Sequence, residues 1–216
     1  MARVLVPAVR ANRTRPSKAA IERAARAIRR GDVVAFPTET VYGLGANALS
    51  AKAARKIFTI KGRLERKPLL VLIANRKDLP LVARSVPPAA EKLMDAFWPG
   101  PLTIIFKKHP RIPSVVSGGK DTVGVRLSSH PVARALVRAA GTPITAPSAN
   151  LSGKPAHRTA RAVARELGTK LGFTFVLDGG RTPIGTPSTI IDVTKKRPSI
   201  VRRGAISEKK ILKILR

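Results

Sequence analysis

Short apolar runs alternate along this chain with longer segments whose apolar residues recur at helical spacing. The runs are ended by proline, glycine or charge and have the length of buried strands, whereas the longer segments have the length of helices. Such alternation favours an α/β architecture. Some links between consecutive strands are too short to hold a crossover helix. We therefore expect a mixed sheet rather than a purely parallel one.

Capping residues mark the expected helices. Ser17 can begin a helix and Gly31 can end it. Thr159 can cap another, and Ser207 can open a last one. The expected helices are 17–30, 51–60, 88–97, 131–140, 159–167 and the segment after 207, and the expected strands are 33–36, 69–73, 102–106, 122–127, 143–145, 173–177, 189–193 and 200–202.

The formal net charge of +30 is extreme for 216 residues. Residues 1–30 and 195–216 each hold nine basic side chains and one acidic side chain. A field of this sign attracts phosphates, whether of a nucleotide or of RNA, although a general basic bias would give the same composition. No internal boundary is visible. We expect a single domain over 1–216, with a core at about 17–207 and basic extensions at both ends.

The absence of cysteine excludes a thiol nucleophile, an iron–sulfur cluster and a disulfide scaffold, and it fits a reducing compartment. The three histidines, His109, His130 and His157, are scattered, so no protein cage for a metal is expected. No apolar run is long enough to span a membrane. We expect a cytoplasmic protein, and we interpret its basic start as mature protein because a helix of the fold begins near Ser17.

Six stretches follow one another in an order that is more informative than any of them alone. They are 36–45 (FPTETVYGLG), 61–63 (KGR), 97–103 (FWPGPLT), 123–127 (VGVRL), 148–150 (SAN) and 187–192 (PSTIID). Together, from about Ser17 to about Ser207, they resemble the YrdC/TsaC-type threonylcarbamoyl-adenylate synthases in their short, single-domain form. The resemblance implies a twisted open mixed sheet, with flanking helices, around a positively charged cavity.

The resemblance also implies a nucleotidyl transfer. L-Threonine and bicarbonate or carbon dioxide would form N-carboxythreonine, which would attack the α-phosphate of ATP, giving threonylcarbamoyl-adenylate and pyrophosphate. A separate transferase would then complete the threonylcarbamoyladenosine modification of tRNA. The expected cofactor is Mg²⁺, which would arrive with ATP. This chemistry needs no enzyme nucleophile, so positioning and electrostatics should dominate.

No Gly-x-x-x-x-Gly-Lys-Ser/Thr loop is present, so side chains must hold the phosphates. The resemblance assigns this role, and catalysis, to Lys61 and Arg63, which on spacing alone would be ordinary basic residues after a helix. Lys67 is a further candidate. Arg202 would also contact nucleotide, its neighbour Arg203 being the competing choice.

Ser148 and Asn150 follow a strand-like segment, and both are expected at the nucleotide, with a possible role in binding Mg²⁺ that is carried by ATP phosphates. The alternative is turn chemistry, because serine and asparagine stabilise turns by bonding to local backbone.

Four residues are expected to bind threonine by resemblance: Thr38, Tyr42, Arg126 and Ser188. Thr38 could instead close its own turn, and Ser188 could cap a strand. Arg126 lies in an apolar strand, where an unpaired charge is costly. The substrate carboxylate is its expected partner, and Glu39 or Asp121 would be structural alternatives. Some relatives place a histidine at the position of Leu72, so that contact is missing here.

Two other functions remain open. A non-catalytic double-stranded RNA-, tRNA- or rRNA-binding maturation factor would use the positive charge, with recognition of backbone and shape because aromatic content is 4%. A carbamoyl-transfer domain of hydrogenase-maturation proteins would be expected beside acylphosphatase-like and zinc-finger-like parts, which this cysteine-free sequence lacks.

Overall fold

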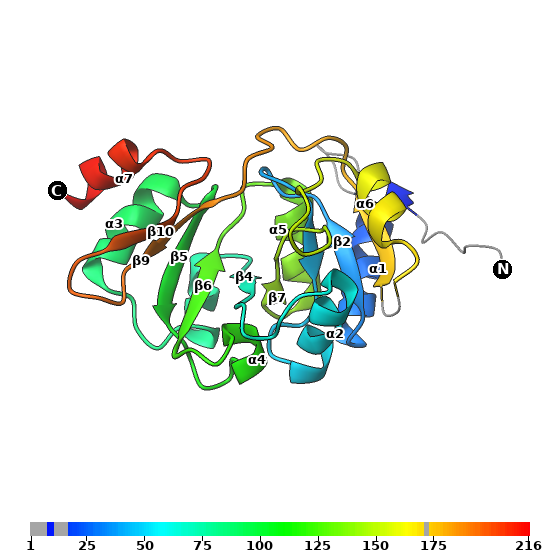
Figure 1. Ribbon diagram of the computed structural model, residues 1–216, viewed down its shortest axis with the longest axis horizontal. Helices are drawn as coiled ribbons and strands as arrows, with labels where there is room; N and C mark the ends of the chain where they lie inside the picture. The colour runs from blue at the N-terminus through cyan, green and yellow to red at the C-terminus, as the bar shows by residue number, and fades with distance from the viewer. Residues whose placement is uncertain (1–7, 11–16, 171–172) are drawn as a thin grey trace.

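The fold is seen in a computed structural model that describes residues 8–10, 17–170 and 173–216. Helices and strands interleave as the sequence predicts (Figure 1). In chain order the elements are β1 (Ala8–Arg10), α1 (Lys18–Arg29), β2 (Val33–Phe36), β3 (Gly43–Gly45), α2 (Ala51–Lys61), β4 (Leu70–Leu72), the 3-10 helix η1 (Arg76–Leu81), α3 (Pro88–Phe97), β5 (Leu102–Lys107), α4 (Ser114–Ser117), β6 (Thr122–Arg126), α5 (Pro131–Ala140), β7 (Ile144–Thr145), α6 (Ala160–Leu167), β8 (Phe173–Asp178), β9 (Thr189–Asp192), β10 (Ser199–Arg202) and α7 (Glu208–Leu215).

Two of the predicted N-terminal caps are confirmed by hydrogen bonds. The side-chain oxygens of Ser17 and Thr159 accept hydrogen bonds from backbone N–H groups in the first turns of α1 and α6. Ser207 precedes α7 without such a bond. Lys61 is the last residue of α2 rather than a residue just past its end.

The strands form two mixed sheets rather than the single sheet expected. One has the order β1-β8-β2-β3, and the other has the order β10-β9-β5-β6-β4-β7. In the first, β2 is parallel to β8 and antiparallel to β3. In the second, β4 and β6 are parallel, whereas β5 and β6 are antiparallel. The mixed α/β prediction is therefore confirmed, and the division into two sheets is the correction.

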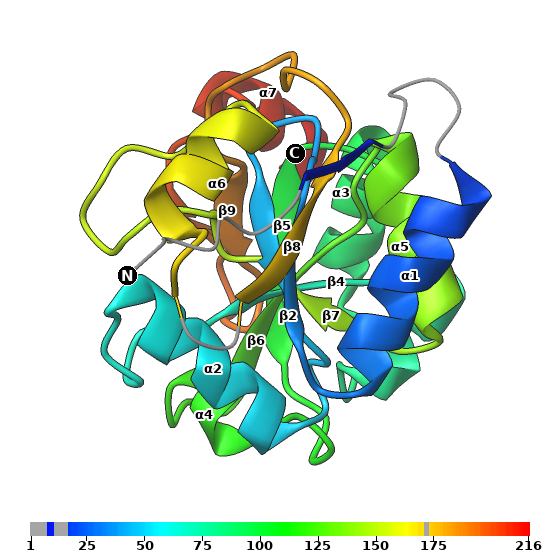
Figure 2. The same ribbon diagram turned by 90° about the vertical axis from the view of Figure 1, so that its right-hand side faces the viewer.

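The first sheet is covered by helices on both faces (Figure 2). Alternate side chains of β2 point to opposite sides, as a pleated strand requires. Val33 and Ala35 join a core that includes residues of α2 and α6. Val34 and Phe36 join a second core, under α1 and α5. This fully buried strand ends directly at the segment 37–42, which is thereby held in a fixed place.

The two sheets meet where β3 runs beside β7 and the loop that follows it. Isolated bridges pair Gly43 with Ser148 and Asn47 with Ile144. The Leu44 N–H donates to Pro147 O at 2.8 Å, and the Ala149 N–H donates to Tyr42 O at 2.8 Å. Segments 42–44 and 147–149, far apart in sequence, therefore lie side by side.

In the described part of the chain, no helix is long and apolar enough to cross a membrane.

Candidate functional site

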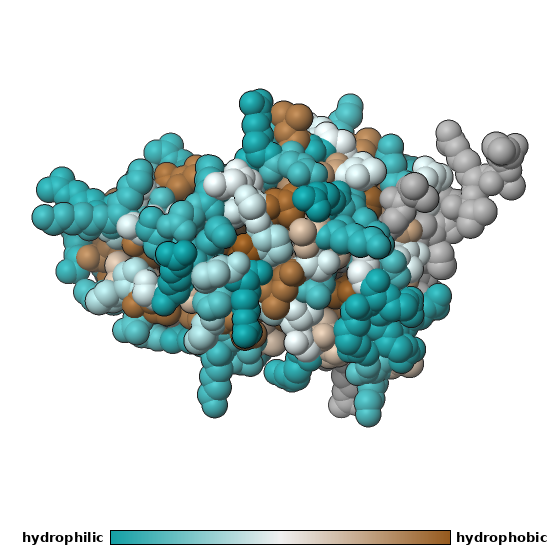
Figure 3. Space-filling view, turned by 90° about the horizontal axis from the view of Figure 1, so that it is seen from below, coloured by the Kyte–Doolittle hydropathy of each residue, from teal (hydrophilic) through white to brown (hydrophobic). Residues whose placement is uncertain are grey.

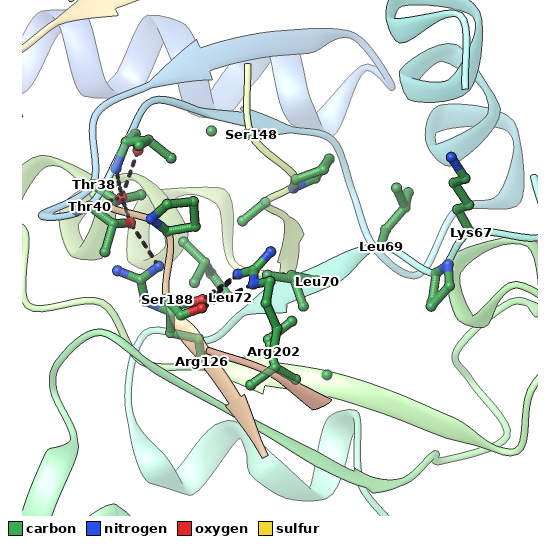
Figure 4. A pocket seen from close by; sticks show the side chains of 18 of the residues that line it. Thr38, Thr40, Lys67, Leu69, Leu70, Leu72, Arg126, Ser148, Ser188 and Arg202 are labelled. Atoms are coloured by element: carbon green, nitrogen blue, oxygen red, sulfur yellow. Dashed lines mark hydrogen bonds between the residues drawn. The ribbon is translucent and has the colours of Figure 1, made fainter. Parts of the chain in front are cut away.

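A cavity of about 330 Å³ opens between the two sheets. Its walls come from the segments after β2 and α2, the faces of β4 and β6, the loop after β7, and the start of β9 with the end of β10. Figure 4 shows Thr38, Thr40, Arg126 and Ser188 gathered at one end, Arg202 near the middle, and Lys67 at the far end. Eight of the ten predicted site residues line this cavity: Thr38, Tyr42, Arg63, Lys67, Arg126, Ser148, Ser188 and Arg202.

The charged residues of the wall are all cationic. Arg63, Lys67, Lys120, Arg126 and Arg202 line the cavity, and none of the described lining residues is acidic. Burial lowers the pKa of Arg63. Burial, followed by the charges of Arg126 and Arg63, lowers the pKa of Arg202. A wall whose charged residues are all cationic favours an anionic ligand.

One face of β6 forms the floor of the cavity. Thr122, Gly124 and Arg126 line it, as alternate residues of one strand should. A Cβ at Gly124 would lie 2.9 Å from Leu70 Cδ2 and 3.2 Å from Thr103 Cγ2, so a side chain there would have to displace both neighbours. From below, apolar surface is visible near the middle of the molecule, between long hydrophilic side chains (Figure 3). The lining also includes the apolar residues Leu70, Leu72, Ile105 and Ile190, so a ligand would meet apolar surface beside the cations.

Arg126 is tied to the fold by three groups. Its Nε donates to Gly100 O at 3.1 Å, and its Nη1 donates to Thr40 Oγ1 at 3.0 Å. Its Nη2 lies 2.8 Å from Glu39 Oε1, an ion pair outside hydrogen-bond geometry. Burial acts to raise the pKa of Glu39, but Arg126 and the Ser128 hydroxyl outweigh it, so the pKa is lowered. The structural pairing with Glu39 is thus present, while Arg126 also faces the cavity.

Thr38 closes its own turn, which was the alternative reading of this residue. Its hydroxyl donates to Val41 O at 2.7 Å and accepts from the N–H groups of Thr40 and Val41. It also lies 2.8 Å from Thr40 Oγ1, which accepts from Arg126. Thr40, which sequence reasoning did not select, therefore links the turn to the arginine.

Ser188 and Arg202 contact each other. Arg202 donates to Ser188 O from Nε at 3.1 Å and from Nη2 at 2.7 Å. The same Nη2 donates to Ser188 Oγ at 3.1 Å, and this hydroxyl lies 2.8 Å from Thr103 Oγ1. Arg203 instead pairs with Glu208 on the surface. Arg202 therefore lines the cavity and Arg203 does not, while the contact of Arg202 with nucleotide stays a prediction.

Tyr42 is fully buried, and its hydroxyl is committed to the backbone after β8. The hydroxyl donates to Gly180 O at 2.8 Å and accepts from the Gly179 N–H at 3.3 Å. Burial, followed by the Asp178 charge, raises its pKa. Tyr42 thus lines the cavity without offering it a free hydroxyl.

Lys61 does not line the cavity. Its side chain is 1% exposed, and its ammonium donates to Asn150 O at 2.7 Å and to Ser148 O. Burial, followed by the charge of Arg63, lowers its pKa to about 8, against an opposing effect of Glu166. In this arrangement Lys61 holds the loop that carries Ser148.

The loop at 148–154 is also held from its other side. Glu166, on α6, accepts from the Leu151 N–H and faces His157 Nε2, both at 2.9 Å. Asn150 donates from Nδ2 to Leu151 O and Lys154 O, so it performs the turn chemistry considered above. Its buried Oδ1 has no hydrogen-bond partner among the described residues. Ser148 lines the cavity, whereas Asn150 does not.

Several other positions were less visible from the sequence. Lys120 lines the cavity and was not selected. Its even spacing with Thr122, Gly124 and Arg126 was a weak signal, because Asp121 interrupts the alternation with apolar residues and Lys120 precedes the strand. Leu72, which replaces the histidine of some relatives, contributes an apolar side chain to the wall. Trp98 belongs to the core, where its Nε1 donates to Leu102 O at 2.7 Å.

A metal would not find a protein cage in this cavity. No group of three or more potential His, Cys, Asp or Glu ligands occurs in the described residues. The described wall offers the hydroxyl of Ser148 but no carboxylate. Since Mg²⁺ prefers oxygen ligands that include anionic ones, phosphates of a bound nucleotide would have to supply them.

Comparison with known proteins places this chain in a family. Residues 26–204 match the Sua5/YciO/YrdC family model, which carries the description "Telomere recombination". The chain belongs to this family.

Two curated relatives and one solved structure show how similar this chain is to known proteins in sequence and fold. A threonylcarbamoyl-AMP synthase of Pyrococcus abyssi is 46% identical over 192 residues, covering 89% of this chain and 56% of that protein. One of Bacillus subtilis is 45% identical over 192 residues, covering 88% of this chain and 55% of that protein. The crystal structure of P. abyssi Sua5 complexed with L-threonine superposes with a TM-score of 0.91 at 44% identity, over 96% of this chain and 61% of that one. The chain thus spans little more than half the length of these relatives.

Proposed function

We propose that this chain synthesises L-threonylcarbamoyl-adenylate from L-threonine, bicarbonate or carbon dioxide, and Mg·ATP, with release of pyrophosphate. The observation that carries the proposal is the cavity with five cationic lining residues and no acidic one among those described. The relatives named as threonylcarbamoyl-AMP synthases, and the threonine complex of one family member, support threonine and a nucleotide as the anionic ligands of this cavity.

The proposed reaction has two bond-forming steps. The threonine nitrogen bonds to the carbon of carbon dioxide and loses a proton, which gives N-carboxythreonine. An oxygen of the new carboxylate then bonds to the α-phosphorus of ATP, while the bond from that phosphorus to the bridging oxygen breaks and pyrophosphate leaves. No covalent enzyme intermediate is formed.

Repulsion between the reactants is the main obstacle that the cavity can remove. Two unit negative charges about 4 Å apart repel by about 4 kcal/mol at an effective dielectric constant of about 20. Arg126, held at the end near Thr40, would take the threonine carboxylate. Arg202 and Arg63 would take phosphate oxygens, since guanidinium forks match such oxygens. Mg²⁺ bound to the phosphates would add further neutralisation.

The proposal includes partners and a location. The adenylate would pass to a threonylcarbamoyl transferase that modifies tRNA. We place the chain in the cytoplasm, which fits the absence of cysteine. The RNA-binding alternative draws on the charge of +30, but the one aromatic residue among the described lining residues is the buried Tyr42, so stacking of several bases there is disfavoured.

The test is pyrophosphate release by the purified chain with Mg²⁺, ATP, bicarbonate and L-threonine, each omitted in turn. Release that requires both threonine and bicarbonate is expected. Release that does not depend on threonine would overturn the proposal. No release from a folded sample that binds RNA with strong salt dependence would overturn it in favour of the RNA-binding alternative.

A further inference from the structure

Residues 179–188 form a strap that joins β8 of the first sheet to β9 of the second. Figure 1 shows it in orange, crossing at the top of the view. Pro187 and Ser188, at its end, are the only residues of the strap among the described residues that line the cavity. The rest of the strap can therefore act on the cavity only through other groups.

The middle of the strap is bonded to the turn that follows β2. The Ile184 N–H donates to Glu39 O at 3.0 Å, and the Gly185 N–H donates to Thr40 O at 2.9 Å. Thr40 lines the cavity, and its hydroxyl accepts from Arg126. The turn thus contacts both the strap and the cavity, so a shift of the strap would move a group that holds Arg126.

Arg158 holds the middle of the strap. Its Nη2 donates to Thr182 O at 2.8 Å and to Pro183 O at 3.1 Å. In return, the Thr182 N–H donates to Arg158 O at 2.9 Å. Gly185 has a φ of 80°, and a Cβ there would lie 2.7 Å from Arg158 Cζ. The Arg158 side chain therefore packs on the strap backbone at a point that favours glycine.

The segment that carries Arg158 is itself fixed. His157 O accepts from the Tyr42 N–H at 3.0 Å, and His157 Nε2 lies 2.9 Å from Glu166 Oε2. Thr159 caps α6. Because both neighbours of Arg158 are held in this way, its guanidinium reaches the strap from a rigid base.

The end of the strap has supports of its own. Pro187 O accepts from the Ala205 N–H at 2.9 Å, and Ser188 Oγ lies 2.8 Å from Thr103 Oγ1. Loss of Arg158 should therefore displace the turn at 38–41 more than the wall at 187–188. Arg202, which contacts Ser188, belongs to the part that should stay in place.

We propose that Arg158 is a positioning residue for the amino-acid end of the cavity. Arg158 holds the strap, the strap holds the turn at 38–41, and Thr40 in that turn bonds to Arg126. This inference rests on the proposed function, in which Arg126 takes the threonine carboxylate. Arg158 itself touches no reacting atom. Its loss should therefore weaken threonine binding and leave the nucleotide in place.

The test compares Arg158→Met with the unaltered chain by steady-state kinetics and by calorimetric titration with L-threonine. Misplacement of a substrate by about 1 Å can cost about a hundredfold in rate. Because Arg158 acts through intermediate contacts, we expect a smaller effect, with the KM and the Kd for threonine each rising by about tenfold. The KM for ATP should change by less than about twofold, because the nucleotide side of the cavity keeps its own supports.

Further variants separate positioning from a general loss of structure. Arg158→Lys should recover most of the threonine affinity, since an ammonium group has donors for the same carbonyls. Gly185→Ala, strained by its positive φ and by contact with Arg158, should reproduce the selective loss. Arg161→Met, the same charge change on the exposed side of α6, is the matched control and should behave normally. Circular dichroism checks that each variant is folded.

Unchanged threonine affinity in the folded variants of Arg158 and Gly185 would overturn the inference. So would an equal rise in the KM for ATP, or an Arg158→Lys variant that binds threonine no better than Arg158→Met. The outcome is separable from the proposed function. Selective loss of threonine binding in a chain that releases no pyrophosphate would retain the positioning role and reject the synthase. Normal turnover with an unchanged KM for threonine in Arg158→Met would do the reverse.

Discussion

At the scale of single residues, the Arg126 guanidinium is bonded to groups of the fold and also lines the cavity. Its partner Glu39 is buried, with 6% of its surface exposed. Removing one member of a buried ion pair typically costs about 3–5 kcal/mol because the other charge is left uncompensated. The pair therefore holds Arg126 in place, and substitution of either member should destabilise the fold.

The lowered pKa of Glu39 makes stability depend on pH. The contribution is fully present above the ordinary carboxyl pKa of 4.5 and is lost as pH falls through the lower folded pKa. Glu39→Gln should therefore be destabilised by about 3–5 kcal/mol at about pH 6 and by less at about pH 3. Urea unfolding of both proteins across this range measures the difference. A gap that stays constant with pH would contradict the assignment.

Arg202 and Arg203 offer a matched pair of neighbouring substitutions. Arg202→Gln removes a guanidinium that lines the cavity and holds Ser188, so the KM for ATP should rise by about tenfold. Arg203→Gln removes an exposed pair with Glu208, which should be worth less than about 1 kcal/mol. Steady-state kinetics with varied ATP compares them. Equal effects would remove Arg202 from the nucleotide site.

Residue types in the site could be predicted, but the directions of their side chains could not. The sequence indicated eight residues that line the cavity, and Thr38, Arg126 and Arg202 are among them. It did not reveal that the Lys61 ammonium faces the carbonyls of Ser148 and Asn150. Those groups lie almost ninety positions away, and their approach depends on how the two sheets meet.

At the scale of elements, helix boundaries were predictable because capping is local chemistry. Ser17 and Thr159 each cap a helix with a side chain three residues from its partner. Strand β3 and helix α4 were missed because each has only three or four residues, too few to establish a period. The split into two sheets was missed because strand pairing connects distant segments.

The end of α2 acts on the Ser148 loop through Lys61. Lys61→Met should keep the fold but release two loop carbonyls, and a misplaced loop should lower kcat/KM by about a hundredfold. Kinetics with circular dichroism as a fold control measures this. A folded variant with normal kcat/KM would show that the loop needs no such support.

The same substitution should change the alkaline pH profile. Because the folded pKa of Lys61 is lowered to about 8 from 10.5, its contribution to stability is full above 10.5 and is lost as pH falls through 8. The difference in unfolding free energy, Lys61 protein minus Lys61→Met, should thus rise between about pH 7 and about pH 10. A difference in unfolding free energy that does not change with pH would contradict the assignment of Lys61 as a buried group that titrates in this range.

At the scale of the whole molecule, the charge of +30 reflects 42 basic residues against 12 acidic ones. Only five of the 42 basic residues are among the described residues that line the cavity, so most of the charge lies elsewhere. A few surface cations are paired, as Arg203 is with Glu208, whereas the described charged residues of the cavity wall are cations alone. A single domain over 1–216 remains a prediction. The family match covers 26–204, so the basic ends lie at or beyond its limits.

The most direct test of the account follows isotopically labelled bicarbonate into the nucleotide product. With the purified chain, Mg·ATP and L-threonine, label should appear in an adenylate that yields AMP and labelled carbon dioxide on hydrolysis. No label should appear when threonine is omitted. Formation of AMP or of a threonine adenylate without label would contradict the central claim, because the carboxylated amino acid would not be the group that attacks ATP.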